Sequence, residues 1–158
     1  MKNDFVSSAR SVSDMKAHLV LSTKYRRKVL TETMIDRLTE IVYDLCQKWG
    51  CKMIEFNGED YYVHLMFQYY PQMDLSKFVG NLKSVSSRRL RQEFPEEINK
   101  YYLKKVFWNE SYFLASCGGV TVDVLRKYIE SLEEYFHYLR SHPDIQLCWR
   151  SKAGLLAF

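Results

Sequence analysis

The sequence of 158 residues contains no apolar run long enough to span a membrane, which argues against an integral membrane protein. Its first residues lack the apolar stretch of a secretion signal, so we expect a cytoplasmic location. Glycine and proline are scarce, at 6 and 3 residues, and no segment rich in either marks a linker. A chain of this length can bury a core as one domain, without disulfides or structural metals.

Cysteine is also sparse, and its spacing excludes the common zinc and redox motifs. Cys46, Cys51, Cys117 and Cys148 form neither a CxxC pair nor a zinc-like repeat. Their apolar surroundings predict free, mostly buried thiols in a reducing compartment. Aromatic residues, in contrast, are abundant: 12 Tyr, 9 Phe and 3 Trp make up 15% of the chain.

Hydrophobic periodicity predicts the order β-α-β-β-α-β-(β)-α. Thr31 and Asp74 can cap the first two helices, Gly50 can end the first, and Asn57-Gly58 is typical of a hairpin turn. This order predicts an α+β fold with an antiparallel or mixed sheet and helices packed on it. The expected strands are 15–22, 51–56, 61–67, 104–108 and 112–116, and the expected helices are 31–50, 74–94 and 121–141.

The chain is expected to hold a single folded domain with two appendages. Residues 1–14 are polar and unpatterned, which predicts a flexible N-terminal arm. Residues 15–141 carry all of the expected helices and strands. Residues 142–158 end in an apolar run and are expected to form a C-terminal extension that docks on the domain or on a partner subunit.

The modest formal net charge of +4 conceals two stretches that carry cations and no acid, 24–28 and 75–92. Rows of guanidinium and hydroxyl groups match phosphate oxygens, and interleaved aromatic rings can stack on the bases of single-stranded nucleic acid. The alternative is a solvated basic surface that complements a helix C-terminus, and composition leaves both interpretations open. The cations are Lys24, Arg26, Arg27, Lys28, Lys77, Lys83, Arg88, Arg89 and Arg91.

Several motifs occur along the chain in a fixed order and with characteristic spacings. They are Lys24-Tyr25-Arg26-Arg27-Lys28, Tyr62-Val63-His64-Leu65, Ser86-Ser87-Arg88-Arg89-Leu90-Arg91, Trp108-Asn109-Glu110-Ser111-Tyr112-Phe113, Gly118-Gly119, Asp123-Val124 and Tyr128-Ile129-Glu130. Taken together, they resemble the small TnpA-like transposases of insertion sequences that move as single-stranded DNA, the single-tyrosine branch of the HUH nucleases. The likeness runs from about His18 to Leu132.

The resemblance implies a ferredoxin-like HUH fold, a homodimer and binding of single-stranded DNA that carries a hairpin. It also implies DNA transposition through a 5′-phosphotyrosine, with Tyr128 as the catalytic nucleophile and Mg²⁺ or Mn²⁺ as the cofactor. By periodicity alone, Tyr128 is typical of a core residue whose hydroxyl lies at the rim. The expected DNA contacts are Lys24, Tyr25, Arg26, Arg27, Lys83, Arg88, Arg89 and Arg91.

The chain departs from the family at two positions that should hold the metal. Tyr62 stands where the first histidine of the His-hydrophobic-His motif belongs, and Leu132 stands where a glutamine belongs. His64 therefore remains as a metal ligand, and strand alternation predicts Asp60 on the same face as a substitute. Glu59 and Glu130 are weaker candidates, and His18 is assigned no catalytic role.

The lost ligands keep a rival interpretation open. The chain can be a catalytically impaired relative that only binds DNA hairpins, because leucine cannot bind a metal and a neutral phenol is a poor ligand for hard cations. An RNA-binding ferredoxin-like domain is a second rival, although no RNP-like pair of aromatic residues stands out on adjacent strands.

Overall fold

The computed structural model describes residues 6–8 and 11–116. The chain divides into two compact units, Met1–Gly118 and Gly119–Phe158, and the described residues belong to the first. The expected last helix with Tyr128, the C-terminal extension, Cys117 and Cys148 lie outside the described residues.

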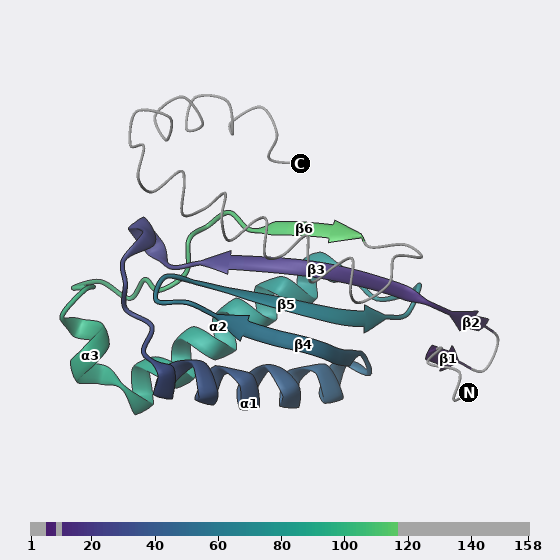
Figure 1. Ribbon diagram of the computed structural model, residues 1–158, viewed down its shortest axis with the longest axis horizontal. Coiled ribbons are helices and arrows are strands. Elements are labelled where there is room, and N and C mark those ends of the chain that lie inside the picture. Colours follow the sequence, from purple (N-terminus) through teal and green to yellow (C-terminus); the bar gives the residue numbers. More distant parts are fainter. Residues whose placement is uncertain (1–5, 9–10, 117–158) are drawn as a thin grey trace, which may run out of the picture. The chain divides into compact units, whose positions relative to one another are not determined.

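A four-stranded sheet forms the centre of the described unit. Its strands are β3 (Met15–Ser22), β4 (Lys52–Gly58), β5 (Tyr62–Tyr69) and β6 (Phe113–Ser116), in the order β4-β5-β3-β6, and every pair is antiparallel. The helices α1 (Glu32–Trp49) and α2 (Leu75–Glu93) lie side by side along one face of this sheet (Figure 1). β3, which comes first in the sequence among these four strands, lies between β5 and β6, the third and fourth. This is the ferredoxin-like arrangement, and it confirms the predicted α+β class.

Short elements complete the unit. The segment expected to be a flexible arm contains a small antiparallel hairpin formed by β1 (Val6–Ser8) and β2 (Ser11–Ser13). A 3₁₀ turn, η1 (Lys24–Arg26), follows β3, and a short helix, α3 (Pro95–Asn99), follows α2. Among the described residues, no helix has the length and hydrophobicity needed to cross a bilayer.

The helix ends are where local sequence chemistry predicts them. The Thr31 side chain accepts a hydrogen bond from the Met34 backbone N–H at 3.3 Å, and the Asp74 carboxylate accepts one from the Lys77 N–H at 3.1 Å. Gly50 ends α1 in the left-handed region, at φ 71°, where the missing Cβ removes the steric penalty. These contacts satisfy donors and acceptors that the helices themselves leave open.

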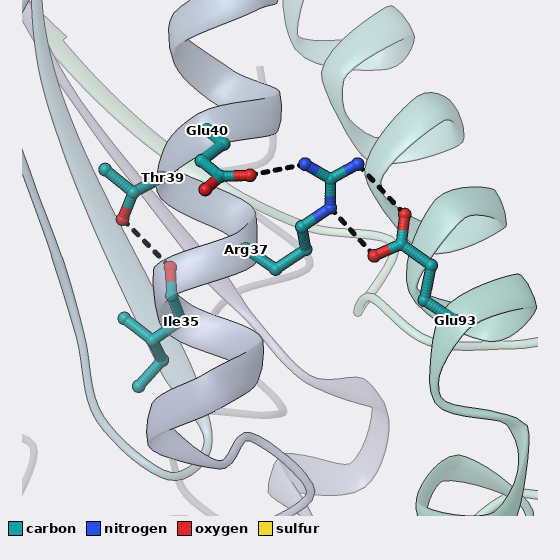
Figure 2. A network of polar contacts seen from close by, with 5 residues as sticks. All are labelled: Ile35, Arg37, Thr39, Glu40 and Glu93. Carbon is teal, nitrogen blue, oxygen red and sulfur yellow. Dashed lines mark hydrogen bonds and ion pairs between the residues drawn. The ribbon is translucent and has the colours of Figure 1, made fainter.

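The two helices are joined near the start of α1 and the end of α2 by a charged contact (Figure 2). The Arg37 guanidinium donates from Nε to one Glu93 oxygen at 2.8 Å and from Nη2 to the other at 3.0 Å. Arg37 also bonds Glu40 within α1. The Arg37 contact holds the pKa of the Glu93 carboxyl below its usual range.

The prediction of a turn at Asn57-Gly58 is wrong. Asn57 and Gly58 belong to β4 and pair with β5, and the chain reverses at residues 59–61 instead. The Glu59 N–H donates to the Tyr62 carbonyl at 2.8 Å, which closes that turn. A Cβ on Gly58 would lie 2.8 Å from Val63 Cγ1, so the glycine permits close packing rather than a turn conformation.

The prediction of a strand at residues 104–108 is also wrong. The segment is irregular, and its one described ladder contact is an isolated antiparallel bridge between Trp108 and Thr23. Side chains and a neighbouring loop satisfy its carbonyls: Arg91 donates to the Lys104 and Val106 carbonyls, and the Lys24 N–H donates to the Phe107 carbonyl at 2.7 Å. A strand partner is therefore not needed.

Both faces of the two central strands are buried. On one face, alternate residues such as Leu19, Leu65 and Phe67 join the core beneath the helices. On the opposite face, His18 and His64 are 1% and 3% exposed. Cys46 and Cys51 are free, buried thiols, as predicted.

Replacing Gly50 by alanine should cost about 1 kcal/mol of unfolding free energy, because the new Cβ must adopt the left-handed conformation. Gly80→Ala is the matched control: Gly80 lies inside α2 and a Cβ there meets nothing within 4 Å. We expect that variant to gain roughly 0.5–1 kcal/mol. Urea denaturation measures both, and equal effects of the two changes would contradict the assignment of Gly50 as the helix cap.

Candidate functional site

The first basic stretch forms a strained turn that exposes an aromatic ring. Tyr25 and Arg26 have φ values of 59° and 51°, in the left-handed region that costs non-glycine residues energy. The Thr23 hydroxyl holds this turn by donating to the Arg27 carbonyl at 2.7 Å. Tyr25 is 64% exposed, and Lys24 Nζ and Arg27 Cζ each lie 5.6 Å from its ring centre. The turn thus presents a ring flanked by two cations.

The irregular segment that follows α3 binds this turn to the body of the protein. The Tyr102 hydroxyl donates to the Lys24 carbonyl at 2.6 Å, and Arg27 donates to the Tyr101 carbonyl. The Trp108 indole N–H donates to the Ser86 hydroxyl of α2 at 2.9 Å, at a buried position. The segment 101–108 therefore contacts both basic stretches.

The two basic stretches meet at Glu110. Lys24 Nζ lies 3.3 Å from a Glu110 carboxylate oxygen, and Lys83 Nζ donates to the Glu110 backbone carbonyl at 2.9 Å. Lys83 Nζ also lies 5.8 Å from the ring centre of Tyr112, which is 41% exposed. Burial lowers the pKa of the Lys83 ammonium, and the nearby Lys24 charge lowers it further, whereas Glu110 raises it.

The predicted DNA contacts differ in how much of their hydrogen-bonding capacity is already used. Arg27 and Arg91 donate to backbone carbonyls, so much of their capacity serves the fold. The side chains of Arg26 and Arg88 are exposed and make no hydrogen bond or ion pair within the described part of the chain. Arg89 is half-buried and lowers the pKa of Glu93. We define the basic surface as Lys24, Tyr25, Arg26, Arg27, Lys83, Arg88, Arg89 and Arg91.

Of the candidate metal ligands, His64 and Tyr62 lie in β5 and are buried. Asp60 precedes the strand, in the turn, so the alternation predicted for it does not extend to its position. Its carboxylate pairs with Lys28 Nζ at 2.8 Å. Within residues 6–8 and 11–116, no cluster of three or more His, Cys, Asp or Glu side chains has the arrangement of a metal site.

His18, to which the sequence assigned no role, is a neighbour of His64. The ring centres are 5.8 Å apart and the ring planes meet at 75°. Burial lowers the pKa of His18 to about 4, with a further contribution from His64, and burial also lowers the pKa of His64. Both imidazoles are therefore neutral at physiological pH. The strand pairing that brings them together could not be read from one sequence.

Comparison with known proteins identifies the family. Residues 11–132 match the family described as "Transposase IS200 like". Because the match covers most of the chain, the protein belongs to this family of transposases, which move insertion sequences. The matched range includes β3, the basic surface, His64 and Tyr128.

Individual relatives agree with this assignment. The chain is 32% identical over 120 residues to the ISDra2 transposase TnpA of Deinococcus radiodurans. This match covers 76% of this chain and 85% of the relative. It is 27% identical over 131 residues to the transposase of insertion sequence element IS200 from Salmonella typhimurium, over 83% of this chain and 86% of that one.

Solved structures share the fold. A crystal structure assigned to a transposase of Deinococcus radiodurans R1 superposes with a TM-score of 0.65 at 29% identity, covering 80% of this chain and 96% of its own. A REP-associated tyrosine transposase bound to a REP hairpin gives a TM-score of 0.54 at 10% identity, covering 78% of this chain and 67% of its own. The second likeness concerns the fold alone.

The buried histidines predict that stability falls with acidification. The pKa of His18 is 6.5 in the unfolded chain and about 4 in the folded protein. The unfolded state therefore binds more protons between pH 6.5 and pH 4. In the protein without added metal, the unfolding free energy should therefore fall by about 2 kcal/mol between pH 7 and pH 5. Denaturant midpoints over this range, where most carboxylates stay ionised, measure the fall. An equally steep fall in His18→Gln would contradict the assignment.

Proposed function

We propose that the chain binds single-stranded DNA that carries a hairpin and cleaves and rejoins it with Tyr128 as nucleophile. The family match, which includes the position of Tyr128, is the observation that carries this proposal. The basic surface supports it, because cations from two separate elements and exposed aromatic rings suit phosphates and unpaired bases. The REP hairpin held by a protein of similar fold is consistent with it.

The chemistry balances without a consumed co-reactant. The Tyr128 phenol oxygen attacks the scissile phosphorus and loses its proton, while the bond from phosphorus to the 3′ oxygen breaks. The 3′ oxygen takes up a proton and leaves as a free hydroxyl, and a 5′-phosphotyrosine remains. Attack by a 3′ hydroxyl on that linkage rejoins the strand and regenerates the phenol.

A divalent cation, Mg²⁺ or Mn²⁺, is part of this proposal. Bound at the site, it would neutralise charge that develops on the non-bridging phosphate oxygens. His64 is the first proposed ligand, and Tyr62 can contribute only a weak phenol donor at the position of the missing histidine. The Asp60 carboxylate already pairs with Lys28 through one oxygen, so the lysine competes with a metal for its charge. We also propose a homodimer as the acting form.

A binding-only protein is the second candidate function. Tyr62 and Leu132, at two expected ligand positions, favour it. Such a protein would keep the basic surface and the fold, and it would recognise hairpins without cutting them.

The test is formation of a covalent adduct. Single-stranded oligonucleotides with an imperfect hairpin, taken from the DNA flanking the gene, are incubated with the protein and Mg²⁺ or Mn²⁺. We expect a protein–DNA band that survives denaturing electrophoresis, because the phosphotyrosine bond is covalent. Tyr128→Phe should abolish this band, and Tyr135→Phe is the matched control that should retain it.

Two outcomes would overturn the catalytic proposal. An adduct that persists in Tyr128→Phe would exclude this residue as the nucleophile. Tight hairpin binding with no adduct under either metal would favour the binding-only protein.

A further inference from the structure

The antiparallel pairing of β3 with β5 brings two histidines together on one face of the sheet. His18 lies opposite Met66, and His64 lies opposite Val20, so the two histidines are diagonal neighbours across the strand pair. Diagonal neighbours on one face lie within reach of long or aromatic side chains. The observed separation of 5.8 Å between ring centres agrees with this geometry.

That separation suits two imidazoles that bind one ion. Metal–nitrogen bonds are about 2.0–2.1 Å long, and each ring nitrogen lies about 1 Å from its ring centre. Two rings on the same ion therefore have centres roughly 4.5–6 Å apart, depending on the angle at the metal. The His18–His64 pair lies inside this range.

The surroundings of the pair supply few other strong ligands. Asn57 on β4 lies opposite His64, and Glu55, two residues earlier on the same strand face, is close enough to favour a positive charge there. The Phe113 ring of β6 lies 6.4 Å from the His18 ring. The two imidazoles are thus the strong nitrogen donors on this face among the described residues.

We propose that His18 and His64 together bind one divalent transition metal, with His18 supplying the second imidazole that Tyr62 does not provide. The second ligand, His18, lies on the adjacent strand β3 and not two residues before His64 on β5. An imidazole pair suits Mn²⁺, Co²⁺ or Zn²⁺ better than Mg²⁺, which prefers oxygen. This inference deepens the metal site of the proposed function and rests on it for the role of the ion.

The experiment measures metal binding in the absence of DNA. The chain has 4 histidines, so the double variant His137→Gln/His142→Gln leaves only His18 and His64. Its histidines are labelled with nitrogen-15, and Zn²⁺ or paramagnetic Co²⁺ is titrated while the imidazole resonances are followed. We expect one ion per chain and simultaneous shifts or broadening of both imidazoles. The near-ultraviolet charge-transfer band of Co²⁺–thiolate bonds reports any binding by cysteine instead.

Single changes then assign the ligands. In the same background, His18→Gln and His64→Gln should each weaken metal binding by at least about tenfold, since both remove a direct ligand. Circular dichroism checks that each variant is folded. If His18→Gln does not fold, the resonances of the double variant, which has both imidazoles, still answer the question.

The outcomes separate this inference from the proposed function. Perturbation of His64 alone, the absence of any imidazole response, or unchanged affinity in His18→Gln would overturn the two-histidine site. Metal-dependent adduct formation could still occur in those cases. Conversely, binding through both imidazoles by a protein that forms no adduct would support the site and contradict the catalytic proposal.

Discussion

The basic surface depends on hydrogen bonds from one irregular segment, residues 101–110, to two elements far apart in the sequence. Trp108 bridges to Thr23 at the end of β3, and its indole N–H reaches Ser86 on α2. Glu110 then receives a lysine from each side. Without these contacts, the turn after β3 and the second helix would be separate charged elements. With them, Lys24 of the turn and Lys83 of α2 both contact Glu110, so cations of the two basic stretches lie next to one another.

The sheet provides the second constraint, because β3 and β5 are buried on both faces. One face packs against α1 and α2 and stabilises the fold. The other face holds His18 and His64, both of which are buried. This face therefore carries the two imidazoles that we propose as metal ligands, in a chain that belongs to a family of transposases.

Local interactions explain which parts of this structure the sequence predicts. The caps at Thr31, Gly50 and Asp74 are settled by residues within one helical turn, and the structure confirms all three. The turn was predicted at Gly58 because glycine is common in turns. In the structure the missing side chain of Gly58 instead leaves room for Val63 on the next strand. Residues 104–108 do not form the expected strand. Arg91 and the Lys24 N–H instead bond to three of the carbonyls in this segment. The partnership of His18 with His64 requires the strand register, which a single sequence does not contain.

The central claim is that the two basic stretches form one surface that binds a DNA hairpin, and the salt dependence of hairpin affinity tests it most directly. Arg26 and Arg88 come from different stretches and are exposed. Arg26→Gln and Arg88→Gln should each weaken binding and each reduce the slope of log affinity against log salt by about one. Lys48→Gln, an exposed cation of α1 outside both stretches, should change neither quantity. A loss confined to one stretch, or an equal loss in Lys48→Gln, would contradict a shared surface.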